Sequence, residues 1–259
     1  MVMSKNRFAV MVAALVFLSS VPVRAADPTG AQSVGISVVK ADTNHKIGDR
    51  YTYRSMDLYS KVEDRQFTMR VTGVADGQVT YGNGGRVTDL LGNDIRYGKG
   101  FEVSGQQIFV PEYAIGKTWT TKYQFKREDG AEFTVTYDFK VVAREQITVP
   151  AGTFDTYRVE GDGYMHQTSG QRGGACAERH SIFKIWIVPD KVRRFIAQDY
   201  IQEGAAIGCR KYVTTRTELM SFVPGEPAAR AESTAIVETP VIIPRSATVE
   251  EPPHSQSND

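Results

Sequence analysis

The stretch FTVTYDFKV, residues 133–141, decides the fold. Apolar residues occupy every odd-numbered position, and polar residues occupy every even-numbered position between them. Side chains on a β-strand point alternately to its two faces, so this period of two predicts a strand with one buried face and one solvated face. Such half-buried strands are typical of antiparallel sheets.

The same alternation recurs in residues 67–72 and 118–125, and Gly-containing turn pairs such as Asp76-Gly77 and Asn83-Gly84 separate these segments. Asp-Gly and Asn-Gly pairs accept the positive φ of tight hairpin turns. The sequence therefore predicts an all-β protein, with about twelve strands in a meander. We expect one large curved antiparallel sheet, forming a half-barrel or an open barrel. Whether the sheet closes is not decided by the pattern.

The segment IGDRYT, residues 47–52, is echoed by IGKTWT, residues 115–120. In each copy a glycine turn leads into a strand that carries aromatic residues. Two interpretations stay open: an internal duplication of a half-sheet, or the weak self-similarity that any β meander shows.

The N-terminal segment resembles an export signal. Lys5 and Arg7 precede an uncharged, mostly apolar run over residues 8–21, and small residues follow before Ala26. A run of about 14 residues is shorter than the roughly 20 that a membrane-spanning helix needs. We therefore predict a signal peptide over residues 1–25, and a periplasmic or secreted protein that does not span the membrane after cleavage.

The remaining chain divides by composition. Residues 26–44 are expected to form a flexible segment, and residues 45–222 a single β domain. Residues 223–259 are rich in Pro, Ala, Glu and Ser and have no aromatic residue, which predicts a disordered tail. Three of the 31 Lys and Arg residues lie in the signal, which leaves 28 against 30 Asp and Glu. This balance argues against a nucleic-acid partner.

The stretch VPAGTF, residues 149–154, has the composition of a turn, because proline presets φ at its second position and glycine is favoured at its fourth. It follows a Gly-x-x-Trp segment at 116–119 and precedes a Trp-x-x-Pro segment at 186–189. In that order these motifs resemble the TapB-like bacterial cell-envelope domains of unknown function, which are related to LolA/LolB-type half-barrels. The resemblance implies a curved sheet in the cell envelope and brings no catalytic residues. This chain lacks the acyl-anchor cysteine of many lipidated members.

The two cysteines, Cys176 and Cys209, both follow the signal, so in an exported chain we predict a disulfide between them. The alternative is a metal site with His166, Glu178 and His180, but the spacing matches no known zinc motif. No Gly-x-Ser-x-Gly motif accompanies the histidines. We predict no cofactor, no metal and no enzymatic activity.

Two sets of residues are candidates for binding. Aromatic side chains on the concave face could line an apolar pocket, although ordinary core packing explains them as well; these are Trp119, Tyr123, Tyr164 and Trp186. Arginines in the second half could attract an anionic envelope component, although a solvated strand face is the commoner explanation; these are Arg172, Arg179, Arg193, Arg194 and Arg210.

These observations favour an exported, non-catalytic β module that binds an apolar or amphipathic ligand, such as a lipid or a glycan, or an envelope protein. The alternative is an interaction or scaffold protein that uses its sheet edges and its tail and takes no small ligand. The identity of the ligand and the oligomeric state do not follow from the sequence.

Overall fold

The structure is a computed structural model that describes residues 37–98, 100–170, 177–204 and 213–225. These residues form fourteen strands and no helix. The strands are β1 (Val39–Lys40), β2 (Arg50–Asp57), β3 (Glu63–Ala75), β4 (Gln78–Tyr81), β5 (Arg86–Asp89), β6 (Asp94–Tyr97), β7 (Glu102–Ser104), β8 (Glu112–Tyr113), β9 (Thr118–Lys126), β10 (Glu132–Val149), β11 (Gly152–Ser169), β12 (Glu178–Ile187), β13 (Phe195–Gly204) and β14 (Val213–Val223). In this part of the chain no helix is long and apolar enough to cross a membrane.

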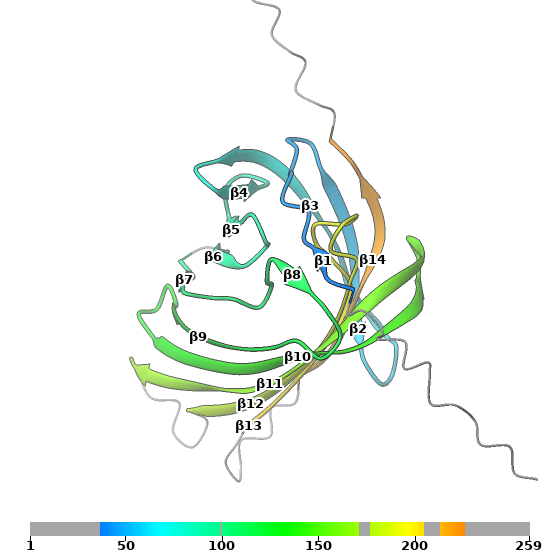
Figure 1. Cartoon of the computed structure of the whole chain (residues 1–259). Helices are drawn as coiled ribbons and strands as arrows, with labels where there is room; N and C mark the ends of the chain where they lie inside the picture. Colours follow the sequence, from blue (N-terminus) through cyan, green and yellow to red (C-terminus); the bar gives the residue numbers. More distant parts are fainter. Residues whose placement is uncertain (1–36, 99, 171–176, 205–212, 226–259) are drawn as a thin grey trace, which may run out of the picture. The chain divides into compact units, whose positions relative to one another are not determined.

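Twelve of the strands form a closed barrel in the order β10-β11-β12-β13-β14-β2-β3-β4-β5-β6-β7-β9 (Figure 1). Every neighbouring pair is antiparallel. Neighbours in the ring are consecutive in sequence except at the β14–β2 and β7–β9 pairs. The predicted all-β antiparallel meander is therefore confirmed. Strands β1 and β8 pair separately as a two-stranded sheet.

The curved sheet forms a barrel, but it is more closed than the expected half-barrel or open barrel, because its two ends pair. The last strand, β14, pairs with the first barrel strand, β2, from Thr215↔Asp57 to Val223↔Arg50. The short strand β7 pairs with β9, which completes the ring. Closure depends on the tilt and register of strands far apart in sequence. Alternation along one strand reports only which of its faces is buried, so it carries no information on closure.

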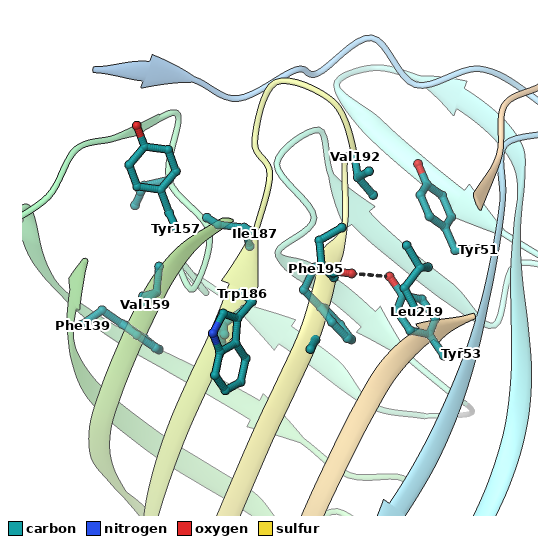
Figure 2. Packing of buried hydrophobic residues seen from close by; sticks show 14 of the residues in the cluster. Tyr51, Tyr53, Phe139, Tyr157, Val159, Trp186, Ile187, Val192, Phe195 and Leu219 are labelled. Atoms are coloured by element: carbon teal, nitrogen blue, oxygen red, sulfur yellow. Dashed lines mark hydrogen bonds between the residues drawn. The ribbon is translucent and has the colours of Figure 1, made fainter. Parts of the chain in front are cut away.

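The alternation of residues 133–141 is confirmed in β10. Its five apolar side chains are buried, with at most 4% of each exposed; they are Phe133, Val135, Tyr137, Phe139 and Val141. Figure 2 shows the neighbouring part of the core, where the Tyr53 hydroxyl on β2 donates a hydrogen bond of 2.9 Å to the carbonyl of Phe195 on β13. This hydrogen bond joins β2 to β13, which lie on either side of β14 in the ring.

The two similar segments occupy equivalent places in the barrel. Gly48 precedes β2 and donates its amide to the carbonyl of Val71 on β3. Gly116 precedes β9 and donates its amide to the carbonyl of Val141 on β10, and each bond is 2.8 Å long. Both glycines have a positive φ, of 95° and 87°. Val71 and Val141 are both fully buried, and a register shift follows each of them in the pairing with the next strand. This shared geometry supports the interpretation of the echo as a structural repeat.

Connecting segments interlock at the end of the barrel where β2, β9 and β13 begin. Asp42 donates its amide to the carbonyl of Pro189, and the Asn93 side chain bonds both the amide and the carbonyl of Phe109. Asp49 is fully buried and accepts hydrogen bonds from the Arg193 side chain at 2.9 Å and the Gly225 amide at 2.8 Å. In Figure 1, β1, β8 and the β12–β13 loop lie inside the outline of the ring.

The VPAGTF stretch forms the tip of the β10–β11 hairpin, as its turn chemistry predicted. Val149 and Gly152 are the last paired residues, and Gly152 takes a positive φ of 131°. The amide of Ala151 donates to the carbonyl of Leu219 on β14 at 3.1 Å. Leu219 lies at a register shift in the β14–β2 pairing, which leaves this carbonyl free to accept. This hydrogen bond therefore joins the tip of the β10–β11 hairpin to β14, which lies three strands from β11 in the ring.

Candidate functional site in the barrel lumen

A cavity of about 360 Å³ lies inside the barrel. Its walls come from β5 and β6 on one side of the ring and from β12 and β13 on the opposite side, so it occupies the lumen rather than the outer surface. Aromatic side chains make up much of the lining; they are Tyr97, Phe109, Tyr123, Phe183, Phe195 and Tyr200. This size and this lining are typical of sites for small organic ligands.

Aromatic contacts hold the cavity wall in place. The Phe183 ring packs against Tyr200 with ring centroids 4.7 Å apart, and edge-on against Tyr137 at 5.1 Å. Tyr137 in turn contacts Phe139, which stacks on Trp119 at 5.4 Å. A row of rings thus crosses β9, β10, β12 and β13, and aromatic pairs of this kind contribute about 0.5–1.5 kcal/mol each beyond the area that they bury.

Glycines make room for two of these rings. Gly161 and Gly163 on β11 lie directly opposite Phe139 and Tyr137 on β10. A Cβ atom at either glycine would overlap the opposing aromatic ring. The rings therefore lie flat against the β11 backbone.

Three charged side chains line the cavity: Arg86, Asp94 and Arg194. Arg86 and Asp94 form a two-point ion pair, with Nε–Oδ1 at 2.7 Å and Nη2–Oδ2 at 3.0 Å. Arg86 also lies over the Tyr97 ring, 5.0 Å from its centroid. Burial lowers the pKa of Arg86, and the positive charge of Arg194 lowers it further.

Arg194 is different from Arg86 because it has no carboxylate partner. Arg194 is only 4% exposed, and its Nε and Nη1 atoms have no hydrogen-bond partner among the described residues. The guanidinium lies over the rings of Tyr81 and Phe195, 5.6 Å and 5.8 Å from their centroids. With two cations and one carboxylate, the cavity lining has a net charge of +1.

The remaining polar groups of the cavity are neutral. Burial raises the pKa of Tyr123 and of Tyr200, so both phenols stay protonated at physiological pH. The Tyr200 hydroxyl accepts a hydrogen bond of 2.6 Å from Gln202. The lining contains no His, Cys, Ser or Lys, and its single carboxylate is paired with Arg86. The arrangement can bind a ligand, but the lining offers no nucleophile with an adjacent base.

A second cavity, of about 500 Å³, lies at β6, β7, β9 and β10. Four of its lining residues are charged; they are Arg96, Glu102, Lys126 and Glu132. Lys126 and Glu132 face each other at 3.6 Å with about half of each side chain exposed, so they are ordinary solvated surface groups. The lumen cavity is therefore the stronger candidate site.

Of the four aromatic residues predicted to bind a ligand, the structure brings Tyr123 to the lumen cavity. Trp119 is packed elsewhere, with Nε1 donating to the Gln107 carbonyl at 2.9 Å. Tyr164 is half exposed and lies beside the ring of His180. Trp186 pairs with Arg158 and shares its face with Lys184, which is the outer face of the barrel. Phe183 and Tyr200 were not among the predicted residues; alternation of Phe183 with the exposed Lys184 is the signal that could have placed Phe183 on the inner face.

The structure describes three of the five arginines that were predicted to attract an anionic partner. Arg172 and Arg210 lie outside the described residues, as do Cys176 and Cys209 of the predicted disulfide. Arg179 is half-buried on β12. Arg193 pairs with Asp42 and Asp49, each at 2.9 Å, and Arg194 lines the cavity. The β12–β13 loop folds into the end of the barrel, so its two arginines point inward, and sequence order could not reveal this.

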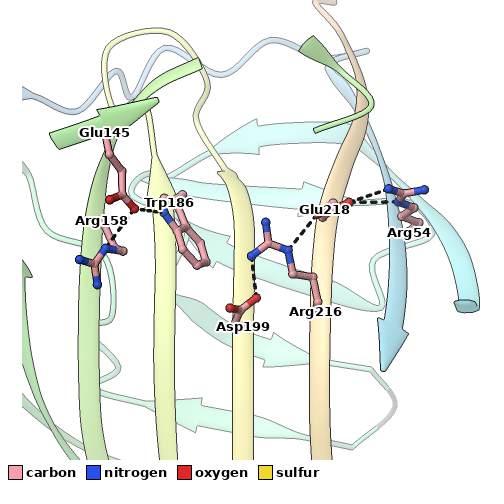
Figure 3. Close-up of polar contacts among 7 residues, drawn as sticks. All are labelled: Arg54, Glu145, Arg158, Trp186, Asp199, Arg216 and Glu218. Carbon is pink, nitrogen blue, oxygen red and sulfur yellow. Dashed lines mark hydrogen bonds and ion pairs between the residues drawn. The ribbon is translucent and has the colours of Figure 1, made fainter. Parts of the chain in front are cut away.

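The outer face of the barrel carries a network of charged side chains around Trp186 (Figure 3). The indole Nε1 donates to Glu145 at 2.7 Å, and Arg158 pairs with the same carboxylate at 3.0 Å. Arg216 lies over the indole ring, 4.8 Å from its centroid, and pairs with both Asp199 and Glu218. These groups satisfy one another, so the network is a structural feature of the wall.

The histidine candidates lie on the same outer side. His180 Nε2 contacts both carboxylate oxygens of Asp162 at 3.1 Å, and Nδ1 lies 3.4 Å from Glu203. Burial lowers the pKa of His180, but these two carboxylates outweigh it and raise the pKa. Ser181 points to the opposite face and contacts the Tyr200 hydroxyl, so it is not paired with His180. Within the described ranges, no group of His, Cys, Asp and Glu is arranged to hold a metal ion.

No protein-family model matches the chain, and no curated protein matches it. Among solved structures, the chain is similar to a proposed exported protein with a YmcC-like fold from Bacteroides fragilis, at 11% identity and a TM-score of 0.44 over 71% of this chain and all of that one. It is also similar to a proposed lipoprotein from Parabacteroides distasonis, at 10% identity and a TM-score of 0.44, again over 71% of this chain and all of the other. The hypothetical lipoprotein YmcC from Escherichia coli matches at 10% identity and a TM-score of 0.39, over 68% of this chain and 85% of that one. These likenesses are too distant to carry a function to this chain.

Proposed function

We propose that the protein is an exported, non-catalytic binding barrel that takes an apolar or amphipathic small ligand in its lumen. One observation carries the proposal: the barrel interior keeps a cavity of about 360 Å³ with a largely aromatic lining. Barrels of about eight strands can already hold one small ligand, and the diameter grows with the number of strands. The export signal predicted over residues 1–25 supports a location in the periplasm or outside the cell.

The chemistry of the lining supports binding rather than turnover. Rings such as Tyr123 and Phe183 offer flat apolar surface, and Gln106 and Gln198 offer hydrogen bonds to a polar part of a ligand. The only carboxylate of the lining, Asp94, is held by Arg86. A ligand would therefore be oriented by a few polar groups within an apolar wall, which is the usual composition of a small-molecule site.

The test is mass spectrometry of organic extracts from protein purified from its native compartment. Phe183→Trp adds volume to the cavity wall, whereas Ile182→Trp adds it to the outer face one residue earlier on the same strand. We expect the extracts of the wild type and of Ile182→Trp to contain an apolar or amphipathic compound, and the extract of Phe183→Trp to lack it. The absence of any bound compound from the wild-type protein would contradict the proposal.

The alternative, a scaffold that uses sheet edges, has less support. Closure of the ring pairs β14 with β2 and β7 with β9, and an open sheet would instead have left two long edge strands. Truncation after Gly225 tests the part of this alternative that involves the tail, and it retains the Gly225 amide that binds Asp49. If the truncated protein loses a partner that the full chain captures, the scaffold function is favoured.

A further inference from the structure

We propose that the lumen binds its ligand by an anionic head group, and that Arg194 is the residue that binds this head group. This inference rests on the proposed binding function and narrows the ligand to an amphiphile with a carboxylate or phosphate head. The unpaired guanidinium of Arg194, on the wall of an aromatic cavity, is the observation that carries it.

The charges of the lining are unbalanced in favour of an anion. Arg86 is matched by Asp94 through two hydrogen bonds, and the Asp94 amide is itself bonded to the Gln106 side chain at 2.6 Å. The hydrogen bonds of that carboxylate therefore go to Arg86, and only its charge acts on Arg194. Arg194 is the second cation of the lining, and no described carboxylate forms an ion pair with it. One bound monoanion would make the cavity neutral.

The neighbouring residue makes the contrast clear. Arg193 is somewhat less buried than Arg194, with 10% of its side chain exposed, and the fold gives it two carboxylates, Asp42 and Asp49. A buried cation without a counter-charge is unfavourable, and proteins retain such groups mainly where function requires them. Arg193 is thus held by two ion pairs at the barrel end, whereas Arg194 has only the rings of Tyr81 and Phe195 and the charge of Asp94 nearby, and no ion pair of its own.

The surroundings of Arg194 also specify the remainder of the ligand. Phe195 lies beside the guanidinium, and Tyr123, Phe183 and Tyr200 continue the wall. The Tyr81 hydroxyl, on the ring beneath the guanidinium, is buried and has no hydrogen-bond partner in the described structure. A planar guanidinium binds carboxylate or phosphate oxygens in pairs, and an aromatic wall favours an alkyl or ring body. The two together fit an anionic amphiphile better than a neutral lipid or a polyanion.

The experiment is isothermal titration of the delipidated full-length protein with octanoate, octyl phosphate and octanol, which share one tail and differ in the head. We expect octanoate or octyl phosphate to bind at least about 10-fold more tightly than octanol, because the charged head gains a charge-assisted hydrogen-bonded pair. The stronger of the two anions identifies the head group. Arg194→Met should remove this preference and leave octanol binding unchanged. Arg144→Met, which removes an exposed arginine paired with Asp155, should change neither.

The outcomes separate the two proposals. If octanoate, octyl phosphate and octanol all fail to bind the wild type, the binding function itself is wrong. If octanol binds as tightly as the two anions, the lumen function stands and the role of Arg194 is overturned. Thermal unfolding of ligand-free Arg194→Met is the companion measurement. A melting temperature equal to or above that of the wild type supports a ligand role, because an unpaired buried charge has been removed; a clearly lower one would show that Arg194 serves the fold and would overturn the inference.

Discussion

The indole Nε1 of Trp186 donates a hydrogen bond of 2.7 Å to Oε1 of Glu145, across the strand that lies between them. Arg158 on that middle strand pairs with the same carboxylate at 3.0 Å. Arg216 covers the indole ring, which explains why Trp186 is only 7% exposed on the outer wall of a barrel. The contacts of Trp186 thus join β10, β11 and β12, and Arg216 from β14 packs on its ring.

Trp186→Phe should therefore weaken the barrel wall without changing the lumen. The substitution removes the hydrogen bond to Glu145 and part of the ring under Arg216. We expect a loss of about 1–3 kcal/mol in the free energy of unfolding, measured by urea denaturation. Ligand binding should be unchanged, since Trp186 is not part of the cavity lining. A large fall in binding at unchanged stability would contradict the placement of Trp186 on the outer face.

Asp49→Asn should be severely destabilising. Asp49 is fully buried and joins Arg193, the Lys46 amide and the Gly225 amide. The substitution leaves the buried Arg193 cation with Asp42 as its sole carboxylate partner, which should cost about 3–5 kcal/mol by analogy with other broken buried pairs. Asp155→Asn is the control, because its pair with Arg144 is half exposed and should contribute about 0–1 kcal/mol. Equal unfolding free energies for the two variants would refute the anchoring role of Asp49.

Gly161→Val should disrupt the aromatic row. A side chain at this position would overlap the Phe139 ring, which is 2% exposed and stacked on Trp119. Forced repacking of such a core costs about 1–3 kcal/mol or more. Gly73→Ala is the matched control on β3, because its added Cβ meets Thr80 at an ordinary distance of 3.6 Å. We expect Gly73→Ala to unfold close to the wild-type urea midpoint and Gly161→Val well below it.

The stability of the protein should fall on acidification through His45. Burial lowers the pKa of His45 below its ordinary value of 6.5, and the charges of Arg193 and Arg194 lower it further, against a raising effect of its hydrogen bond to Leu90. The unfolded chain then binds the proton more readily than the folded protein. The contribution of His45 to stability is therefore present above pH 6.5 and is lost as the pH falls through the folded-state pKa of His45. The His45→Gln variant should lose less unfolding free energy than the wild type between pH 7.5 and pH 5.

His180 provides the opposite sign and serves as the control. Asp162 and Glu203 raise its pKa against the lowering effect of burial. Its contribution to stability is therefore present below pH 6.5 and is lost as the pH rises through the folded-state value. Urea unfolding of His180→Gln over the same pH range should show a steeper acid loss than the wild type. The same slope for both variants would contradict the assignment.

The sequence predicted the local structure of the barrel well and the site poorly. Alternation in residues 133–141 identified the buried face of β10, and the chemistry of VPAGTF identified its hairpin tip. Tyr123 was placed correctly on the inner face because β9 alternates clearly. Arg194 was named only as one of five arginines that could attract an anionic partner, and its place in the lumen was not predicted, because a loop has no periodicity that shows the direction of a side chain. Trp186 was assigned to the concave face because its strand is apolar on both sides.

The all-β class, the meander order of most strands and turns such as VPAGTF could be predicted from the amino-acid pattern, because these depend on residues within a few positions of one another. Closure of the sheet became visible only in the folded chain, since β14 and β2 pair across more than 150 residues. The folded chain also decided that Arg193 meets two carboxylates and Arg194 meets none. The physical reason is that closure and charge pairing are set by contacts between distant segments, and such contacts leave no period in the sequence.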